Sequence, residues 1–371
     1  MSRVHLGDVA IEHKETCKED KSMYPIVGLE HLTPEQIILQ NWDLNTENTF
    51  TKVFRKGNIL FGRRRAYLKK AAVAPFDGIC SGDITVIEAK EDKIIPELLP
   101  FVIQNDDLFD FAVGKSAGSL SPRVKWTHLQ NYEFELPDKP KQYELAKVLW
   151  AIENTRKSYQ ELIKRTDELV KSQFIELFGD PIANDKGWET KPLKSVAPEC
   201  RPSIPKQERY WWLNLDMIES YSGYVVAKVY ESIENIGNST STFDDTMVLY
   251  SKLRPYLNKV IVPDDFGYAT TELVGLKPDE RVLNKYFLFN LLRGDQFVSY
   301  ANGLSAGGQM PRMPMKKMRN FQCIIPPLEL QERFVEFYKQ SDKSKFGKEM
   351  CDKWILEIKN LCCQMYLTLR Q

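Results

Sequence analysis

The chain has 371 residues, of which 43% are hydrophobic and 27% charged, and its 51 basic residues balance its 51 acidic ones. This length suggests two or three domains, and the composition is that of a soluble globular protein rather than a disordered or collagen-like one. The longest apolar runs, such as residues 287–292, are far shorter than the roughly 18 to 20 residues of a membrane-spanning helix. The first ten residues lack the apolar stretch of a secretory signal. We therefore expect a cytoplasmic protein with reduced thiols and no membrane partner.

Short apolar runs bounded by turn residues occupy the first part of the chain. Residues 58–61, 71–74 and 84–87 are bounded by Gly, Pro, Asp or Asn, which predicts short strands. With one helix, they are expected to form an irregular α/β domain. Residues 52–70 contain eight basic residues and no acidic one, a local charge that favours phosphates. The alternative is a solvated basic face.

A long helix is predicted after this domain. Apolar residues recur there at alternating spacings of four and three, and Gly179 and Pro181 end the pattern. The predicted seam of this helix contains Leu145, Leu149, Ile152, Ile163, Val170 and Leu177.

An internal repeat organises the rest of the sequence. Shifting the chain by 189 residues aligns residues 60–137 with 249–326, without a gap. The identities cluster in RRAYLKK and LRPYLNK, and in the glycine-serine segments 114–123 and 303–312. The chain is therefore interpreted as a tandem duplication of a unit of about 190 residues.

The end of the chain repeats the helical spacing. Its predicted seam contains Ile355, Ile358, Met365 and Leu369, although residues 339–348 are polar. We expect the two long helices to pack as an antiparallel coiled coil with pseudo-twofold symmetry, in an α+β fold with two similar α/β domains. The predicted boundaries are 1–139 for the first domain, 140–180 for the first helix, 181–327 for the second domain and 328–371 for the second helix.

Three segments carry a family resemblance. KSQFIELFGDP at 171–181, NDKGWETKPL at 184–193 and SKLRPYLNK at 251–259, in this order within a duplicated chain, resemble the specificity subunit of bacterial type I restriction-modification systems. The resemblance implies a non-catalytic subunit of a site-specific DNA adenine methyltransferase and restriction complex, which defends the cell against foreign DNA. Its two target recognition domains would recognise a bipartite sequence in double-stranded DNA.

The resemblance also implies partners. Two methyltransferase subunits would dock on the helices and in turn recruit restriction subunits. S-adenosylmethionine, ATP and Mg²⁺ would be bound by those partners, with no cofactor or metal in this chain. Consistent with this, the sequence contains no G-x-x-x-x-G-K-[ST] phosphate loop, no visible glycine-rich loop for S-adenosylmethionine, and no Cys or His pair at zinc-ligand spacing.

The alternative function is a stand-alone DNA-modifying enzyme or nuclease with an unrecognised active site. Asp83 ahead of Glu88 and Lys90 could hold a catalytic Mg²⁺, but in the second copy Lys277 and Asp279 replace the last two residues. The duplication therefore argues against a nuclease. A helical scaffold without a nucleic-acid role is a third possibility.

Candidate DNA contacts follow from the chemistry of the side chains, since Arg and Lys contact phosphates or guanine and Asn or Gln pairs with adenine. In the first domain they are Arg63, Arg64, Arg65, Tyr67, Lys69, Lys70, Ser116, Ser119, Arg123 and Lys125. In the second they are Lys252, Arg254, Tyr256, Asn258, Lys259, Ser305, Gln309, Arg312 and Lys316. Positions shared by both copies could instead hold the fold. Base readout is then expected at differing pairs: Ser119/Gly308, Leu120/Gln309 and Lys69/Asn258.

Overall fold

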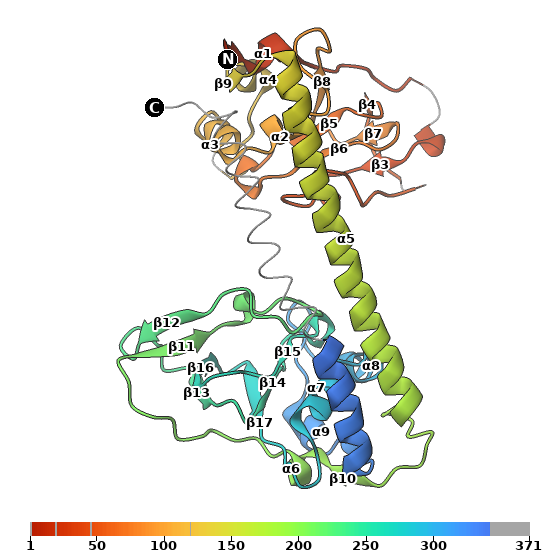
Figure 1. The fold of residues 1–371 in the computed structure, drawn as a ribbon, viewed down its shortest axis with the longest axis vertical. Helices are drawn as coiled ribbons and strands as arrows, with labels where there is room; N and C mark the ends of the chain where they lie inside the picture. The colour runs from red at the N-terminus through yellow and green to blue at the C-terminus, as the bar shows by residue number, and fades with distance from the viewer. Residues whose placement is uncertain (1, 19–20, 45–46, 119, 342–371) are drawn as a thin grey trace. The chain divides into compact units, whose positions relative to one another are not determined.

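The computed structural model describes residues 2–18, 21–44, 47–118 and 120–341. The chain divides after Gln160 into two compact units. Each unit combines short helices with small β-sheets (Figure 1). The fold is α+β, as predicted.

The first unit contains two sheets and a separate strand pair. The sheet orders are β2-β8-β5-β6 and β3-β7-β4, and β1 pairs antiparallel with β9. The strands are β1 Ser2–His5, β2 Ala10–Glu12, β3 Ile26–Val27, β4 Lys52–Phe54, β5 Ile59–Gly62, β6 Ala71–Val73, β7 Gly78–Cys80, β8 Ile84–Ala89 and β9 Glu133–Leu136. The three predicted strands correspond to β5, β6 and β8, which lie side by side in one sheet.

The prediction of a single helix in the first domain was wrong. The described residues that precede the long helix contain α1 Leu6–Val9, α2 Leu99–Ile103, α3 Asp106–Gly114 and α4 Trp126–Leu129, with 3-10 turns η1 Lys21–Met23 and η2 Ala66–Leu68. Most of these helices are four or five residues long. An apolar stripe needs about two turns to become visible in a sequence, so such helices leave no periodic signal.

The second unit has an analogous plan. Its sheet orders are β12-β11-β16-β13 and β15-β14-β17, and β10 pairs with β18. The strands are β10 Thr190–Pro192, β11 Arg209–Leu213, β12 Val229–Ser232, β13 Thr240–Phe243, β14 Val248–Ser251, β15 Val260–Ile261, β16 Gly267–Thr270, β17 Leu273–Leu276 and β18 Gln322–Ile324. The helices are α6 Leu193–Val196, α7 Lys285–Arg293, α8 Asp295–Leu304 and α9 Met315–Arg319, with 3-10 turns η3 Leu215–Met217 and η4 Pro255–Leu257.

Matching hydrogen bonds relate the two units. The amide of Leu6 donates to the carbonyl of Tyr132 at 2.8 Å, and the amide of Leu193 donates to that of Phe321 at 2.9 Å. These contacts place α1 and α6 beside the strand pairs that close each unit. The structure therefore contains the duplication that the sequence predicts.

The long helix α5 spans Lys139–Phe178. Its seam was expected to pack on the second long helix. The seam residues at its ends are part of the domain cores: Leu145 and Leu149 lie in the core of the first unit, and Val170 lies in the core of the second, which also contains Phe334 from the start of the second long helix. Leu177 packs against the second core, and Ile152 and Ile163 are partly buried.

The second long helix is described only at its start, where residues 328–341 are helical. Phe334 is fully buried there and packs against α5, with its ring centroid 5.3 Å from that of Phe174. The predicted seam residues Ile355, Ile358, Met365 and Leu369 lie outside the described residues, as does the predicted coiled-coil pairing.

Substitution of Phe178 tests the anchoring of α5. Its fully buried ring packs 4.8 Å from the ring of Phe287 and 5.6 Å from that of Phe334. Because a large cavity would remain, Phe178→Ala is expected to lower the free energy of unfolding by about 3–5 kcal/mol. Chemical denaturation of the full chain measures this. Leu169→Ala, at an exposed position of α5, is the control and should change stability by no more than about 0.5 kcal/mol; equal losses in the two variants would contradict the anchoring.

Candidate nucleic-acid interface

Two of the predicted DNA-contact clusters lie side by side in the first unit. We call residues 63–70 the basic turn and residues 117–123 the glycine loop. The amide of Arg65 donates to the carbonyl of Pro122 at 2.8 Å, and the amide of Val124 donates to that of Arg63 at 3.0 Å. The amide and carbonyl of Arg123 also pair with those of Ala117, at 2.9 and 3.1 Å, which closes the glycine loop. Both clusters therefore form one surface.

The second unit repeats this arrangement with a basic turn at 252–259 and a glycine loop at 306–312. The amide of Arg254 donates to the carbonyl of Pro311 at 2.7 Å, and the amide of Met313 donates to that of Lys252 at 2.8 Å. Arg312 pairs with Ala306 in the same way as Arg123 with Ala117. The shared positions of the repeat thus include the backbone contacts that join the two loops.

The basic turns have an unusual backbone conformation. Arg65 and Lys69 flank η2 with φ of 54° and 50°, and Arg254 and Asn258 flank η4 with φ of 49° and 47°. Non-glycine residues rarely adopt this left-handed conformation, which costs roughly 1–2 kcal/mol per residue. Between the two left-handed residues, Tyr67 and Tyr256 are exposed. The same strained turn presents a tyrosine in both units.

A carboxylate lies within each basic surface. Asp83 accepts two hydrogen bonds from the guanidinium of Arg123, at 2.6 and 3.1 Å. Glu272 accepts from Arg312 in the second unit, at 3.0 and 3.2 Å. The hydrogen bonds from Arg123 hold the pKa of Asp83 below its usual range, although partial burial opposes this effect. Two predicted DNA contacts, Arg123 and Arg312, are therefore already paired within the protein.

Other arginines of the surface have donors without partners. The Nε atoms of Arg63, Arg64 and Arg254 are buried and have no hydrogen-bond partner among the described residues. Buried polar groups are nearly always hydrogen-bonded in native proteins, so each such donor requires an explanation. If a conformational change exposed them, an anionic ligand with oxygen acceptors, such as a phosphate, would satisfy them.

Several predicted contacts are hydrogen-bonded inside their own unit. Ser116 and Ser305 donate to the carbonyls of Ala112 and Ala301, both at 2.8 Å, at the ends of α3 and α8. These hydroxyls therefore bond the helix backbone. Because the same hydrogen bond occurs at the equivalent serine of both copies, these serines stabilise the fold of each unit.

The lysines of the basic turns also bond internally. Lys70 and Lys259 donate to the carbonyls of Leu29 and Leu215, at 2.8 and 2.6 Å, and burial lowers the pKa of Lys259. Lys69 forms an ion pair with Asp106 at 2.6 Å. These ammonium groups would have to exchange a protein partner for a DNA oxygen.

Asn258 is the predicted contact that fits least. Its side chain is 3% exposed, and its Nδ2 donates to the carbonyl of Arg293 at 2.9 Å. Asn258 aligns with Lys69 in the repeat, and this difference between the copies predicted base readout. Its side-chain amide instead forms a buried hydrogen bond that stabilises the turn.

Exposed candidates remain in both units. They are Arg65, Tyr67 and Lys125 in the first unit, and Tyr256, Gln309 and Lys316 in the second. Two apolar side chains of the glycine loops are also exposed: Leu120 at 90% and Met310 at 53%. Leu120 was singled out by its difference from Gln309, whereas Met310 was missed because a methionine carries no charge or hydrogen-bonding signal. Ser119 lies outside the described residues.

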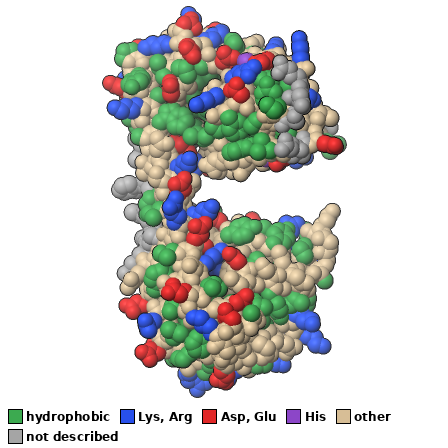
Figure 2. Space-filling view, turned by 90° about the vertical axis from the view of Figure 1, so that its right-hand side faces the viewer, with side chains coloured by type: hydrophobic (Ala, Val, Ile, Leu, Met, Phe, Trp, Pro, Cys, Tyr) green, Lys and Arg blue, Asp and Glu red, His purple; other side chains and the backbone are tan. Residues whose placement is uncertain are grey.

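The surface charge is local rather than global. On the face drawn in Figure 2, basic side chains lie in small groups among acidic and apolar ones in both units. This matches the balanced composition of 51 basic and 51 acidic residues. Attraction of a polyanion must therefore come from particular loops, because the net charge contributes nothing.

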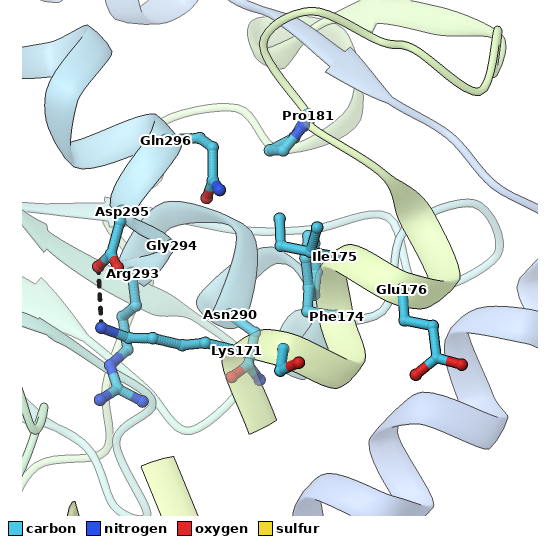
Figure 3. A pocket seen from close by; sticks show the side chains of 11 residues that line it. Lys171, Phe174, Ile175, Glu176, Pro181, Asn290, Arg293, Gly294, Asp295 and Gln296 are labelled. Atoms are coloured by element: carbon cyan, nitrogen blue, oxygen red, sulfur yellow. Dashed lines mark hydrogen bonds and ion pairs between the residues drawn. The ribbon is translucent and has the colours of Figure 1, made fainter. Parts of the chain in front are cut away.

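A pocket of about 540 Å³ lies between α5 and the α7–α8 junction of the second unit (Figure 3). Phe174 and Ile175 line it from α5, and Lys171 reaches across to Asp295 at 2.9 Å. Arg293 is buried and pairs with Asp167 at 3.0 Å. Both cations of the pocket thus have carboxylate partners.

The nuclease-like residues are engaged separately. Asp83 pairs with Arg123, while Glu88 contacts His13 Nδ1 at 2.7 Å and Lys90 donates to the carbonyl of Gly7 at 2.6 Å. Within the described ranges, no three His, Cys, Asp or Glu side chains are grouped as metal ligands. The three residues therefore do not converge on one site.

Comparisons with known proteins assign the family. The family model described as "Type I restriction modification DNA specificity domain" matches residues 3–165 and again residues 185–349. The chain belongs to this family. The two matched segments each contain one basic turn and one glycine loop, so both family domains carry the same surface.

Individual members of the family are distant relatives. The EcoDI specificity subunit of Escherichia coli is 27% identical over 125 residues, which are 33% of this chain and 27% of that protein. The putative MjaX specificity subunit of Methanocaldococcus jannaschii is 19% identical, over 92% of this chain and 87% of that protein. The S subunit of a type I restriction-modification system from M. genitalium has the same fold, with a TM-score of 0.59, 10% identity, and coverage of 100% of this chain and 96% of that one.

The described helices were also compared with the requirements of a bilayer. None of them combines the length and the apolar character that a membrane span needs.

The Asp83–Arg123 pair predicts a pH dependence. Because the pKa of Asp83 is lowered in the folded state, the pair contributes stability above the ordinary Asp pKa of about 3.9, and this contribution is lost as the pH falls through the lowered value. Arg123→Gln should raise the pKa of Asp83 toward its ordinary value, as measured by NMR titration of the carboxyl carbon. Asp279, whose pKa is lowered by Arg281, is the internal control. An unchanged pKa of Asp83 in the variant would contradict the pairing.

Proposed function

We propose that this chain is the non-catalytic DNA-recognition subunit of a type I restriction-modification complex, and that each unit reads one half of a bipartite duplex target. The observation that carries the proposal is the repetition of one loop arrangement in the two segments that match the DNA specificity family. Two equivalent surfaces on one chain suit a target with two separated half-sites.

The basic turn and the glycine loop form the proposed contact surface of each unit. Arg65, Arg64 and Arg254 are proposed to contact phosphates. Arg65 is exposed, and Arg64 and Arg254 are partly exposed and each have a buried Nε without a partner among the described residues. Phosphate contacts set affinity and position, while base edges supply specificity. Exposed residues that differ between the copies, such as Leu120 and Gln309, are proposed to read bases.

The proposed domain boundaries remain 1–139, 140–180, 181–327 and 328–371. Helix α5 occupies most of residues 140–180, and its side chains Val148, Leu162 and Leu169 are exposed. We propose that two methyltransferase subunits dock on this helical region and that restriction subunits join through them, in the cytoplasm. S-adenosylmethionine, ATP and Mg²⁺ then belong to those partners.

Methylome sequencing tests the proposal directly. Cells that contain the chain and its methyltransferase partner should carry one methylated bipartite motif, which disappears when the chain is deleted. Replacing residues 191–326 with the corresponding segment of a relative should change one half of that motif and leave the other half unchanged. The matched chimera replaces the equivalent part of the first unit and should change the opposite half. Simultaneous change of both halves in either chimera would refute the one-unit, one-half-site model.

Salt dependence of DNA binding tests the basic turn. Arg65→Asn removes a charge at a left-handed position where Asn is tolerated, so the turn should keep its shape. Each lost phosphate contact reduces the slope of log affinity against log salt by about 0.9 on duplex DNA. Binding titrations at several salt concentrations measure this slope, with Lys14→Asn, an exposed cation outside the surface, as the control. Equal slopes for Arg65→Asn and the wild-type chain would exclude a phosphate contact at Arg65.

A further inference from the structure

Each proposed DNA-binding surface contains one acidic residue whose position is repeated. Glu272 lies between β16 and β17, with Arg312 at 3.0 Å and Lys252 Nζ at 4.0 Å. Asp83 occupies the equivalent position in the first unit, with Arg123 at 2.6 Å and Arg64 at 3.6 Å. The carboxylate is kept in both copies although its side-chain length differs.

The arginine paired with this carboxylate lies where the glycine loop, the basic turn and the loop that carries the carboxylate contact one another. Arg312 closes the glycine loop through its backbone pairing with Ala306. The preceding residue, Pro311, accepts the hydrogen bond from the amide of Arg254 in the basic turn. The carbonyl of Glu272 in turn accepts from the amide of Lys252, at 3.0 Å. The ion pair therefore fixes the glycine loop against the loop before β17, and backbone hydrogen bonds join both of these loops to the basic turn.

Neither stability nor affinity explains a carboxylate at this place. The side chains of Glu272 and Arg312 are 24% and 48% exposed, and ion pairs with that much solvent contact add little to stability. A negative charge on this surface also repels the phosphates of DNA. The advantage of the carboxylate must therefore lie in the loop geometry that it maintains.

We propose that Asp83 and Glu272 are positioning residues for sequence specificity, each for the half-site read by its own unit. This proposal rests on the proposed function. By holding Arg123 and Arg312, the carboxylates fix the glycine loops and thereby the side chains that face the bases. The carboxylates thereby increase discrimination between DNA sequences, and their negative charge lowers the affinity for DNA of any sequence.

The experiment uses the full chain in complex with its methyltransferase partner. Glu272→Gln removes the charge and keeps the size of the side chain. The methylome of cells with this variant should show a motif that has become degenerate only in the half determined by residues 191–326. Asp83→Asn should make only the other half degenerate, so the two variants control each other.

Binding to duplex oligonucleotides that carry the wild-type motif separates specificity from affinity. In the Glu272→Gln complex, discrimination against a single-base change in the affected half should fall at least about fivefold, the lower end of the cost of one mismatched base pair. Affinity for unrelated duplex DNA should stay equal or increase, because a repulsive charge has gone. Loss of affinity for both kinds of DNA would overturn the proposal.

Two further variants and the wild-type complex complete the test. Glu272→Asp should retain the motif, because the first unit uses Asp at the equivalent position, and failure to do so would overturn the proposal. Asp279→Asn breaks a similar exposed pair with Arg281 outside the surface and should leave the motif unchanged. An unchanged motif in both Glu272→Gln and Asp83→Asn, or degeneracy of both halves in either, would also overturn it. If the wild-type complex gives no bipartite motif, the proposed function itself fails.

Discussion

A loop that presents its side chains to another molecule must still satisfy its own backbone hydrogen bonds. In this chain the requirement is met by pairing one irregular loop with another. The hydrogen bond from Arg65 to Pro122, and its equivalent from Arg254 to Pro311, connect each basic turn to a glycine loop. Buried backbone groups without partners are costly, so neither loop could keep its conformation alone. The candidate surface in each unit follows from this mutual support.

The ion pairs around this surface differ between the two copies. In the first unit, Lys69 of the basic turn pairs with Asp106 at the start of α3. In the second unit the lysine is replaced by Asn258, which turns inward, and the equivalent aspartate, Asp295, pairs with Lys171 of α5. The partner of the helix-start carboxylate has therefore moved from the basic turn to the spacer helix. The equivalent carboxylate thus binds a different segment in each copy.

Much of the organisation could be predicted from the sequence because duplication supplies an internal comparison. It aligned both basic turns and both glycine loops, and the seam spacing located α5. The contacts between the clusters could not be predicted, since Asp83 and Arg123 are 40 positions apart and each is an ordinary charged residue in its local context. The burial of Asn258 and the hydrogen bonds of Ser116 and Ser305 depend on tertiary packing, which side-chain chemistry alone does not specify. For the same reason, the sequence did not indicate that the ends of the α5 seam also contribute to the domain cores.

The left-handed residues that flank η2 and η4 limit how new specificities can arise. Positions 65, 69, 254 and 258 all have positive φ, so β-branched residues there would strain the turn, whereas Gly and Asn are accommodated. Between and beyond these four positions, Tyr67, Leu120, Tyr256 and Gln309 are exposed and can vary without disturbing the backbone. Substitutions at the exposed positions can thus change the recognised DNA sequence while the backbone conformation of the turns stays the same. A library built to redirect recognition would randomise the exposed positions and leave the four left-handed ones as they are.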